Sequence, residues 1–106
     1  MLKDNYNGVE FSSPIEAAKN VVGELRDKGC TFVICLSHLG LNIPGRYSDE
    51  QLAAETEGID VILGGHSHDS FDAPIVRKNS AGKDVVINHT GKNGRNVGVL
   101  SVTFAQ

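Results

Sequence analysis

The stretch VILGGHSH, at residues 61–68, runs from three apolar residues through two glycines to two histidines separated by one serine. A short apolar run bounded by glycine is typical of a strand buried inside a sheet. A second such run, TFVICLS at residues 31–37, ends directly before His38. Neither run alternates polar and apolar residues. We therefore expect two strands buried on both faces, as in a parallel sheet covered by helices.

Helical patterns precede both predicted strands. Residues 12–29, SSPIEAAKNVVGELRDKG, place apolar residues at helical spacing, and Ser13 with Glu16 has the spacing of a capping box. A shorter helix is predicted at residues 48–57, with Ser48 as its N-cap. The order helix, strand, helix, strand predicts an α/β fold in which a right-handed crossover joins a parallel strand pair.

The second half of the chain has a different pattern. The segments APIVRK and DVVINHT flank a polar turn that contains Gly82, and this arrangement predicts an antiparallel β-hairpin. The run VGVLSVTF at residues 97–104 alternates in the manner of a strand, and GVEF at residues 8–11 is a candidate opening strand. We expect residues 1–106 to form a single unit: two helices, a parallel pair and then hairpin strands.

Composition excludes some classes of partner. The chain has 106 residues and a formal net charge of -3. Its basic residues form no stripe, so we expect no nucleic-acid binding. No apolar run approaches the roughly 20 residues that a membrane-spanning helix needs, and we expect no membrane segment.

Three of the four histidines follow the two predicted buried strands. Because the carboxyl ends of parallel neighbours meet at one edge of a sheet, His38, His66 and His68 are expected to lie together. Several neutral imidazoles around one pocket can hold Zn, Fe, Ni or Cu. Any one of them could instead be an ordinary polar loop residue. Asp69 and Asp72 are weaker candidate ligands. For His89, after the hairpin strand, a structural role is favoured over a place at the rim of the same cleft.

Two details of the loop support a shared cleft. An extended backbone would point His66 and His68 to the same side, since side-chain direction repeats every two residues. The glycines of residues 64–65 would let the chain turn and leave room for an ion and an anionic ligand. Ser37 and Ser67 could donate hydrogen bonds that orient the imidazoles.

These motifs together resemble the 5′-nucleotidase family of metallophosphoesterases, which includes 2′,3′-cyclic-nucleotide phosphodiesterases. The resemblance lies in VICLSHLGL, GIDVILGGHSHDSF and VVINHTGKNGRNVGVLSVTF, and it covers nearly the whole chain from about residue 8. It implies the latter part of a catalytic domain with a calcineurin-like αββα sandwich. It also implies a hydrolase of phosphate esters, nucleotides among them, with a periplasmic or extracellular parent protein.

The resemblance assigns a role to each of the three histidines. His38 and His66 would ligate one divalent ion and His68 its partner, in a pair of Mn, Zn, Fe or Co ions. The family's D-x-H and GNHE motifs do not occur in this sequence. We therefore expect no catalytic residue here, no activity of the isolated chain, and self-association through the surface that the absent half would cover. The alternative is a non-catalytic module in which three histidines hold one metal ion.

Overall fold

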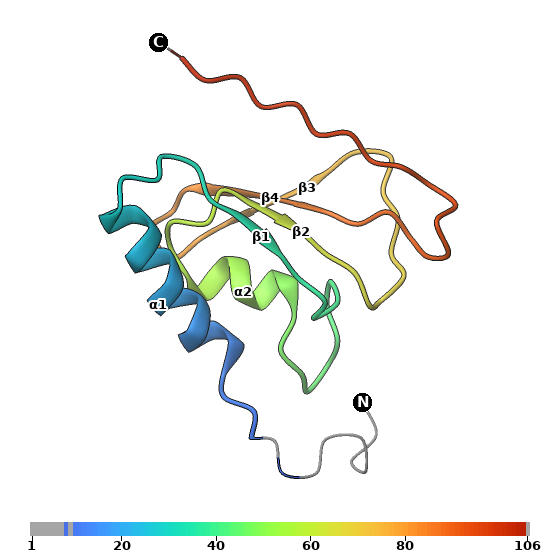
Figure 1. The fold of residues 1–106 in the computed structure, drawn as a ribbon. Coiled ribbons are helices and arrows are strands. Elements are labelled where there is room, and N and C mark those ends of the chain that lie inside the picture. The colour runs from blue at the N-terminus through green and yellow to red at the C-terminus, as the bar shows by residue number, and fades with distance from the viewer. Residues whose placement is uncertain (1–7, 9, 106) are drawn as a thin grey trace.

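The computed structural model describes residue 8 and residues 10–105 (Figure 1). It contains two helices and four strands within that part of the chain. In chain order they are α1 (Pro14–Asp27), β1 (Ile34–Leu36), α2 (Asp49–Glu55), β2 (Val61–Leu63), β3 (Ile75–Lys78) and β4 (Asp84–Asn88). No described helix is long and apolar enough to cross a membrane.

The four strands form one sheet in the order β1-β2-β4-β3. β1 pairs with β2 in parallel, with Cys35 beside Ile62, and β2 pairs with β4 in parallel, with Ile62 beside Ile87. β3 and β4 form the antiparallel hairpin. The α/β class, the parallel pair and the hairpin are therefore confirmed, and the parallel part of the sheet extends to a third strand.

Both helices begin where their capping residues predict. The Ser13 hydroxyl accepts from the Glu16 amide at 3.3 Å, and the Ser48 hydroxyl accepts from the Gln51 amide at 3.3 Å. The carboxylate of Glu16 pairs with Lys19. Each N-cap thus satisfies an amide that would otherwise have no partner in the first turn.

The core lies between the helices and one face of the sheet. Ile62, Val85 and Ile87 are fully buried there, and Leu52 of α2 packs against them. Figure 1 shows both helices on this side and the C-terminal segment on the other. Burial of these aliphatic side chains provides most of the stabilisation that a small α/β unit can gain.

The opposite face of the sheet is open at β1, which corrects one prediction. Ile34 is 51% exposed and Leu36 is 81% exposed, so β1 is not buried on both faces. An apolar run shows that both faces of a strand suit burial, but among the described residues helices cover only one of them.

The ends of the chain differ from the predicted strands as well. Residues 97–104 form no strand, and Val97 and Val99 are about nine-tenths exposed, at 90% and 88%. Phe104 meets Phe32 edge-to-face, with ring centroids 5.4 Å apart. A strand requires a hydrogen-bonded neighbour, and no described segment pairs with residues 97–104. Residue 9 lies outside the described residues, and residues 10–11 form no strand.

Candidate metal centre

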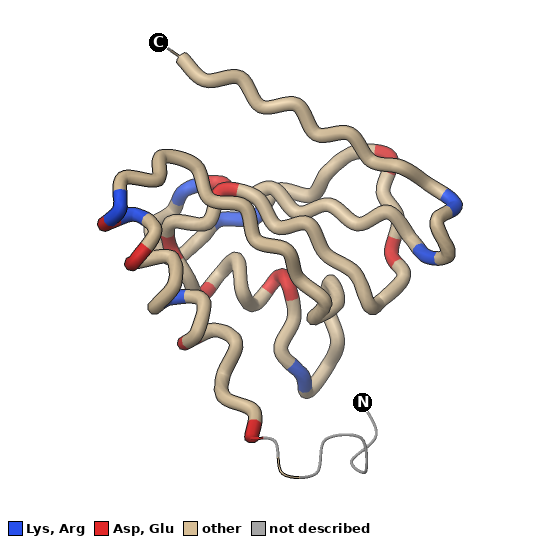
Figure 2. The backbone as a smooth tube through the Cα atoms, viewed as in Figure 1, with Lys and Arg blue, Asp and Glu red and all other residues tan. Residues whose placement is uncertain are grey.

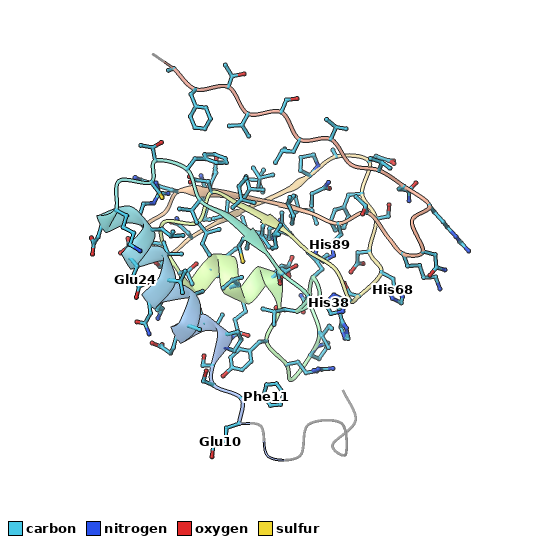
Figure 3. The ribbon with its side chains drawn as sticks, viewed as in Figure 1. Glu10, Phe11, Glu24, His38, His68 and His89 are labelled. Atoms are coloured by element: carbon cyan, nitrogen blue, oxygen red, sulfur yellow. The ribbon has the colours of Figure 1, made fainter. Side chains whose placement is uncertain are left out.

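The sheet brings the ends of β1 and β2 side by side, and the histidines follow from there. Ser37 continues the pairing of β1, with its amide donating to Leu63 of β2 at 2.9 Å, and His38 comes next. His66 follows two glycines after β2. Figure 3 shows His38, His68 and His89 at this end of the sheet. The fold therefore places these histidines where the sequence predicts them, at the carboxyl ends of neighbouring parallel strands.

Two of the three predicted ligands lie close together. The ring centroids of His38 and His66 are 5.0 Å apart, with the rings inclined at 72°. Gly65 lies against His38, because a Cβ there would come within 3.3 Å of Nδ1 of His38 and would press on the ring. Both imidazoles are exposed, so their nitrogens are open to an ion from solvent.

His68 does not join this pair in a three-residue cluster. Within residues 10–105, no group of three or more His, Cys, Asp or Glu side chains is arranged to hold a metal ion. His66 and His68 have φ values of 80° and 63°, in the left-handed region. The expected extended geometry is therefore wrong, and the two-residue alternation that would aim both rings the same way does not apply. The described side chains form neither complete ligand set, so the ligand assignments stay predictions.

The loop serines bond to carboxylates. The Ser37 hydroxyl donates to Asp49 Oδ1 at 2.5 Å, and the Ser67 hydroxyl donates to Asp69 Oδ2 at 2.5 Å. Ser67 also accepts from the Leu41 amide, which ties the two histidine loops together. Neither of these hydroxyls donates to an imidazole, so the serines act on the histidines only indirectly, through the loops that they hold. The hydrogen bonds of the two serines fix the loops. Asp72, the other candidate carboxylate ligand, is exposed.

Beneath the histidine loops lies a buried pair that the sequence did not reveal. Nε2 of His89 is 2.7 Å from Oδ2 of Asp49, with the two residues 2% and 0% exposed. His89 directly follows β4, and Asp49 is the first residue of α2. An acid is common in the first turn after a serine N-cap, where it stabilises the helix, so nothing in the sequence pattern singles out Asp49. His89 is buried beneath the loops and does not lie at an exposed rim.

The side chains of Asp49 and His89 occupy the space next to Gly64. A Cβ at Gly64 would overlap Oδ2 of Asp49 and Nε2 of His89. The two glycines of residues 64–65 thus make room for protein side chains: Gly64 for the buried pair and Gly65 for His38. Room for an ion and an anionic ligand beside these glycines stays a prediction.

Desolvation acts on the one thiol near the pair. Burial raises the pKa of the Cys35 thiol above its ordinary value, and the nearby Asp49 carboxylate raises it further. Cys35 points to the core side of the sheet, next to Ile62. This shift has a structural cause and gives the thiol no nucleophilic role.

Known proteins resemble both the sequence and the fold. The chain is 33% identical to an apyrase of Anopheles gambiae over 91% of this chain and 19% of the apyrase. A 5′-nucleotidase precursor from Thermus thermophilus has a TM-score of 0.57 and 33% identity, over 74% of this chain and 17% of its own. The NAD nucleotidase of Haemophilus influenzae has a TM-score of 0.64 and 25% identity, over 78% and 18%. No family model matches. The chain spans less than a fifth of each of these three relatives.

Proposed function

We propose that this chain, which belongs to the 5′-nucleotidase family by its sequence and its fold, forms part of a nucleotide-hydrolysing domain and supplies histidine ligands to its metal centre. The observation that carries the proposal is the His38–His66 pair, with ring centroids 5.0 Å apart at the ends of neighbouring parallel strands. Ligand sites of open parallel sheets are found at such ends.

The donors fit two positions of a coordination sphere. His38 and His66 would hold one divalent ion, and His68 would belong to a second ion of a pair of Mn, Zn, Fe or Co ions. Neutral imidazole is a good ligand for such metals. Two imidazoles do not complete a sphere, so further ligands must come from other groups. When bound, a metal pair of this kind activates water and neutralises charge on a phosphoryl group.

The proposed substrate class is a phosphate ester, with a nucleotide as the natural candidate. The relatives named above are a 5′-nucleotidase, an apyrase and an NAD nucleotidase. We propose that this chain binds metal and that none of its residues transfers a proton. We therefore expect no turnover of p-nitrophenyl phosphate by the isolated chain. We also propose a periplasmic or extracellular setting for the whole enzyme.

Cobalt titration tests the proposal directly. Co²⁺ replaces the proposed metals and reports its ligands through visible absorption. We expect the chain to bind Co²⁺ with imidazole-type absorption, and His38→Ala or His66→Ala to abolish that binding. His68→Ala is the matched control, since it removes an exposed loop imidazole assigned to the other ion. Equal loss in all three variants, or no Co²⁺ uptake by the unmodified chain, would contradict the assignment.

We extend the proposal to self-association through the open face of the sheet. Ile34, Leu36, Val97 and Val99 leave apolar surface in contact with solvent, and exposed apolar surface can mark a contact site. A second copy of the chain would cover the same residues on both partners. Sedimentation velocity should show dimers that dissociate on dilution and weaken in Leu36→Lys. A monomer that persists at high concentration would refute this part.

A further inference from the structure

The Asp49–His89 pair connects the ends of all three parallel strands. His89 follows β4, Ser37 follows β1, and Gly64 follows β2, and each of them meets Asp49 or its partner. We propose that Asp49 and His89 are positioning residues of the metal centre, which hold His38 and His66 at their separation. This inference rests on the proposed function.

The contact with β1 bears on His38. The Asp49 carboxylate accepts from the Ser37 hydroxyl at 2.5 Å, and that hydroxyl in turn accepts from the Leu39 amide at 3.1 Å. These two hydrogen bonds fix the backbone on both sides of His38. The Asp49 amide also donates to the carbonyl of Gly40 at 2.7 Å, so α2 holds the same loop a second time.

The contact with β2 bears on His66. Gly64 donates its amide to the carbonyl of Asn88 at 3.0 Å, directly before His89. With no Cβ at Gly64, its backbone rests on the Asp49–His89 pair. A shift of the pair would therefore move the backbone from which His66 projects.

The chemistry of the pair is costly for a purely structural element. Nδ1 of His89 is buried and has no hydrogen-bond partner among the described residues. Replacing both partners of a buried hydrogen bond by apolar groups of the same shape can be nearly neutral for stability, or stabilising. A buried nitrogen without a partner calls for an explanation, and the contacts of Asp49 and His89 with all three strand ends supply one: a geometric requirement at this place.

The test compares three substitutions with one matched control. Asp49→Asn and Ser37→Ala remove hydrogen-bonding capacity below His38, and His89→Leu keeps much of the volume but no polar contact. Asp60→Asn is the control, because Asp60 joins Arg26 at the other end of the sheet, away from the histidines. All variants are compared at a temperature at which circular dichroism shows that each of them is folded.

Co²⁺ affinity of the His38–His66 pair is the first measurement. Loss of groups that orient metal ligands typically weakens metal binding about 10–100-fold. We expect losses in that range for the three substitutions and an unchanged affinity for Asp60→Asn. Unchanged affinity in folded His89→Leu and Asp49→Asn would overturn the inference, with the proposed function intact.

Imidazole NMR of the metal-free chain is the second measurement and is independent of the proposed metal. We expect the His38 and His66 ring signals to shift or broaden in the three substitutions and to stay in place in Asp60→Asn. If the unmodified chain binds no Co²⁺, the proposed function fails, while these signals still decide whether the pair positions the rings. Unaltered ring signals would overturn the positioning role.

Discussion

The two ends of the sheet each contain a carboxylate that joins distant segments, but in different surroundings. At the amino end, Asp60 accepts from Arg26 at 2.8 Å and from the Val33 amide at 2.8 Å, and both side chains are about one-third exposed. At the carboxyl end, Asp49 and His89 are sealed from solvent. Figure 2 shows most of the charged positions, of both signs, on the side of the molecule that contains α1, and fewer near the loops that follow the strands.

The two ends differ in whether their buried polar groups all have hydrogen-bond partners. Arg26 also donates to the carbonyls of Gly58 and Cys30, so the amino-end network is complete and reachable by water. The carboxyl end keeps an unpartnered Nδ1 on His89 and left-handed backbone at His66 and His68. Strain of this kind persists where surrounding structure enforces it, often at functional sites. We infer that the amino end serves stability and the carboxyl end serves binding.

A surface hollow does not alter this assignment. It has a volume of about 970 Å³, lies at the amino end and is lined by residues that include Arg26, Asp60 and Lys83. No histidine lines it, and its charged side chains have mixed signs. The candidate metal centre is identified by its donors, which lie at the other end of the sheet.

The largest expected effect comes from adding one methyl group at the carboxyl end. Gly64→Ala should lower the free energy of unfolding by about 2–3 kcal/mol, because its Cβ would overlap the buried Asp49–His89 pair. Gly23→Ala is the matched control: it lies in α1 with open space around it, and should raise that free energy by about 0.5–1 kcal/mol. Urea unfolding measures both. Similar small effects at the two glycines would show that the pair is not tightly packed.

Removing the backbone strain should separate stability from binding. His66→Gly should raise the metal-free unfolding free energy by about 0.5–1 kcal/mol, since glycine accepts a φ of 80° without a Cβ penalty. The same change at His38, which is not among the left-handed residues, should lower it by a similar amount. Both variants should lose Co²⁺ binding. A destabilised His66→Gly would mean that the ring contact with His38 outweighs the strain.

The amino-end ion pair should contribute less. A double-mutant cycle with Arg26→Met and Asp60→Asn should give a coupling free energy of about 1 kcal/mol or less, since both groups are partly solvated. The coupling should shrink in 1 M NaCl. A coupling as large as the Gly64→Ala effect would remove the contrast between the two ends.

Much of the fold could be predicted from local patterns. Ser13 and Ser48 mark helix starts because capping is decided by a few adjacent residues. The parallel pairing of β1 with β2 follows from the helix between them, and it places His38 and His66 at one edge. These parts of the site depend on chain order, which the sequence contains.

The remaining features depend on contacts that chain order does not contain. Asp49 and His89 are 40 positions apart, and each has a common local explanation. The left-handed φ of His66 and His68 could not be expected beside two glycines, which adopt that region more readily. The open face at Leu36 escaped prediction because an apolar strand shows a need for burial without showing what covers it.

The reactivity of the two cysteines should show the smallest difference between the two ends of the sheet. Cys30 is exposed near the amino end, whereas burial and the Asp49 carboxylate raise the pKa of the Cys35 thiol. A raised pKa leaves less thiolate at a given pH, so iodoacetamide at pH 8 should modify Cys30 well before Cys35. Asp49→Asn should speed modification of Cys35 slightly and leave Cys30 unchanged, because burial is the larger cause of the shift. Mass spectrometry of the alkylated chain measures both rates, and the urea-unfolded chain supplies the reference in which they should converge. Equal rates in the folded chain would mean that the core beneath β1 opens to solvent, and the carboxyl end would then not be the sealed region that the Asp49–His89 pair requires.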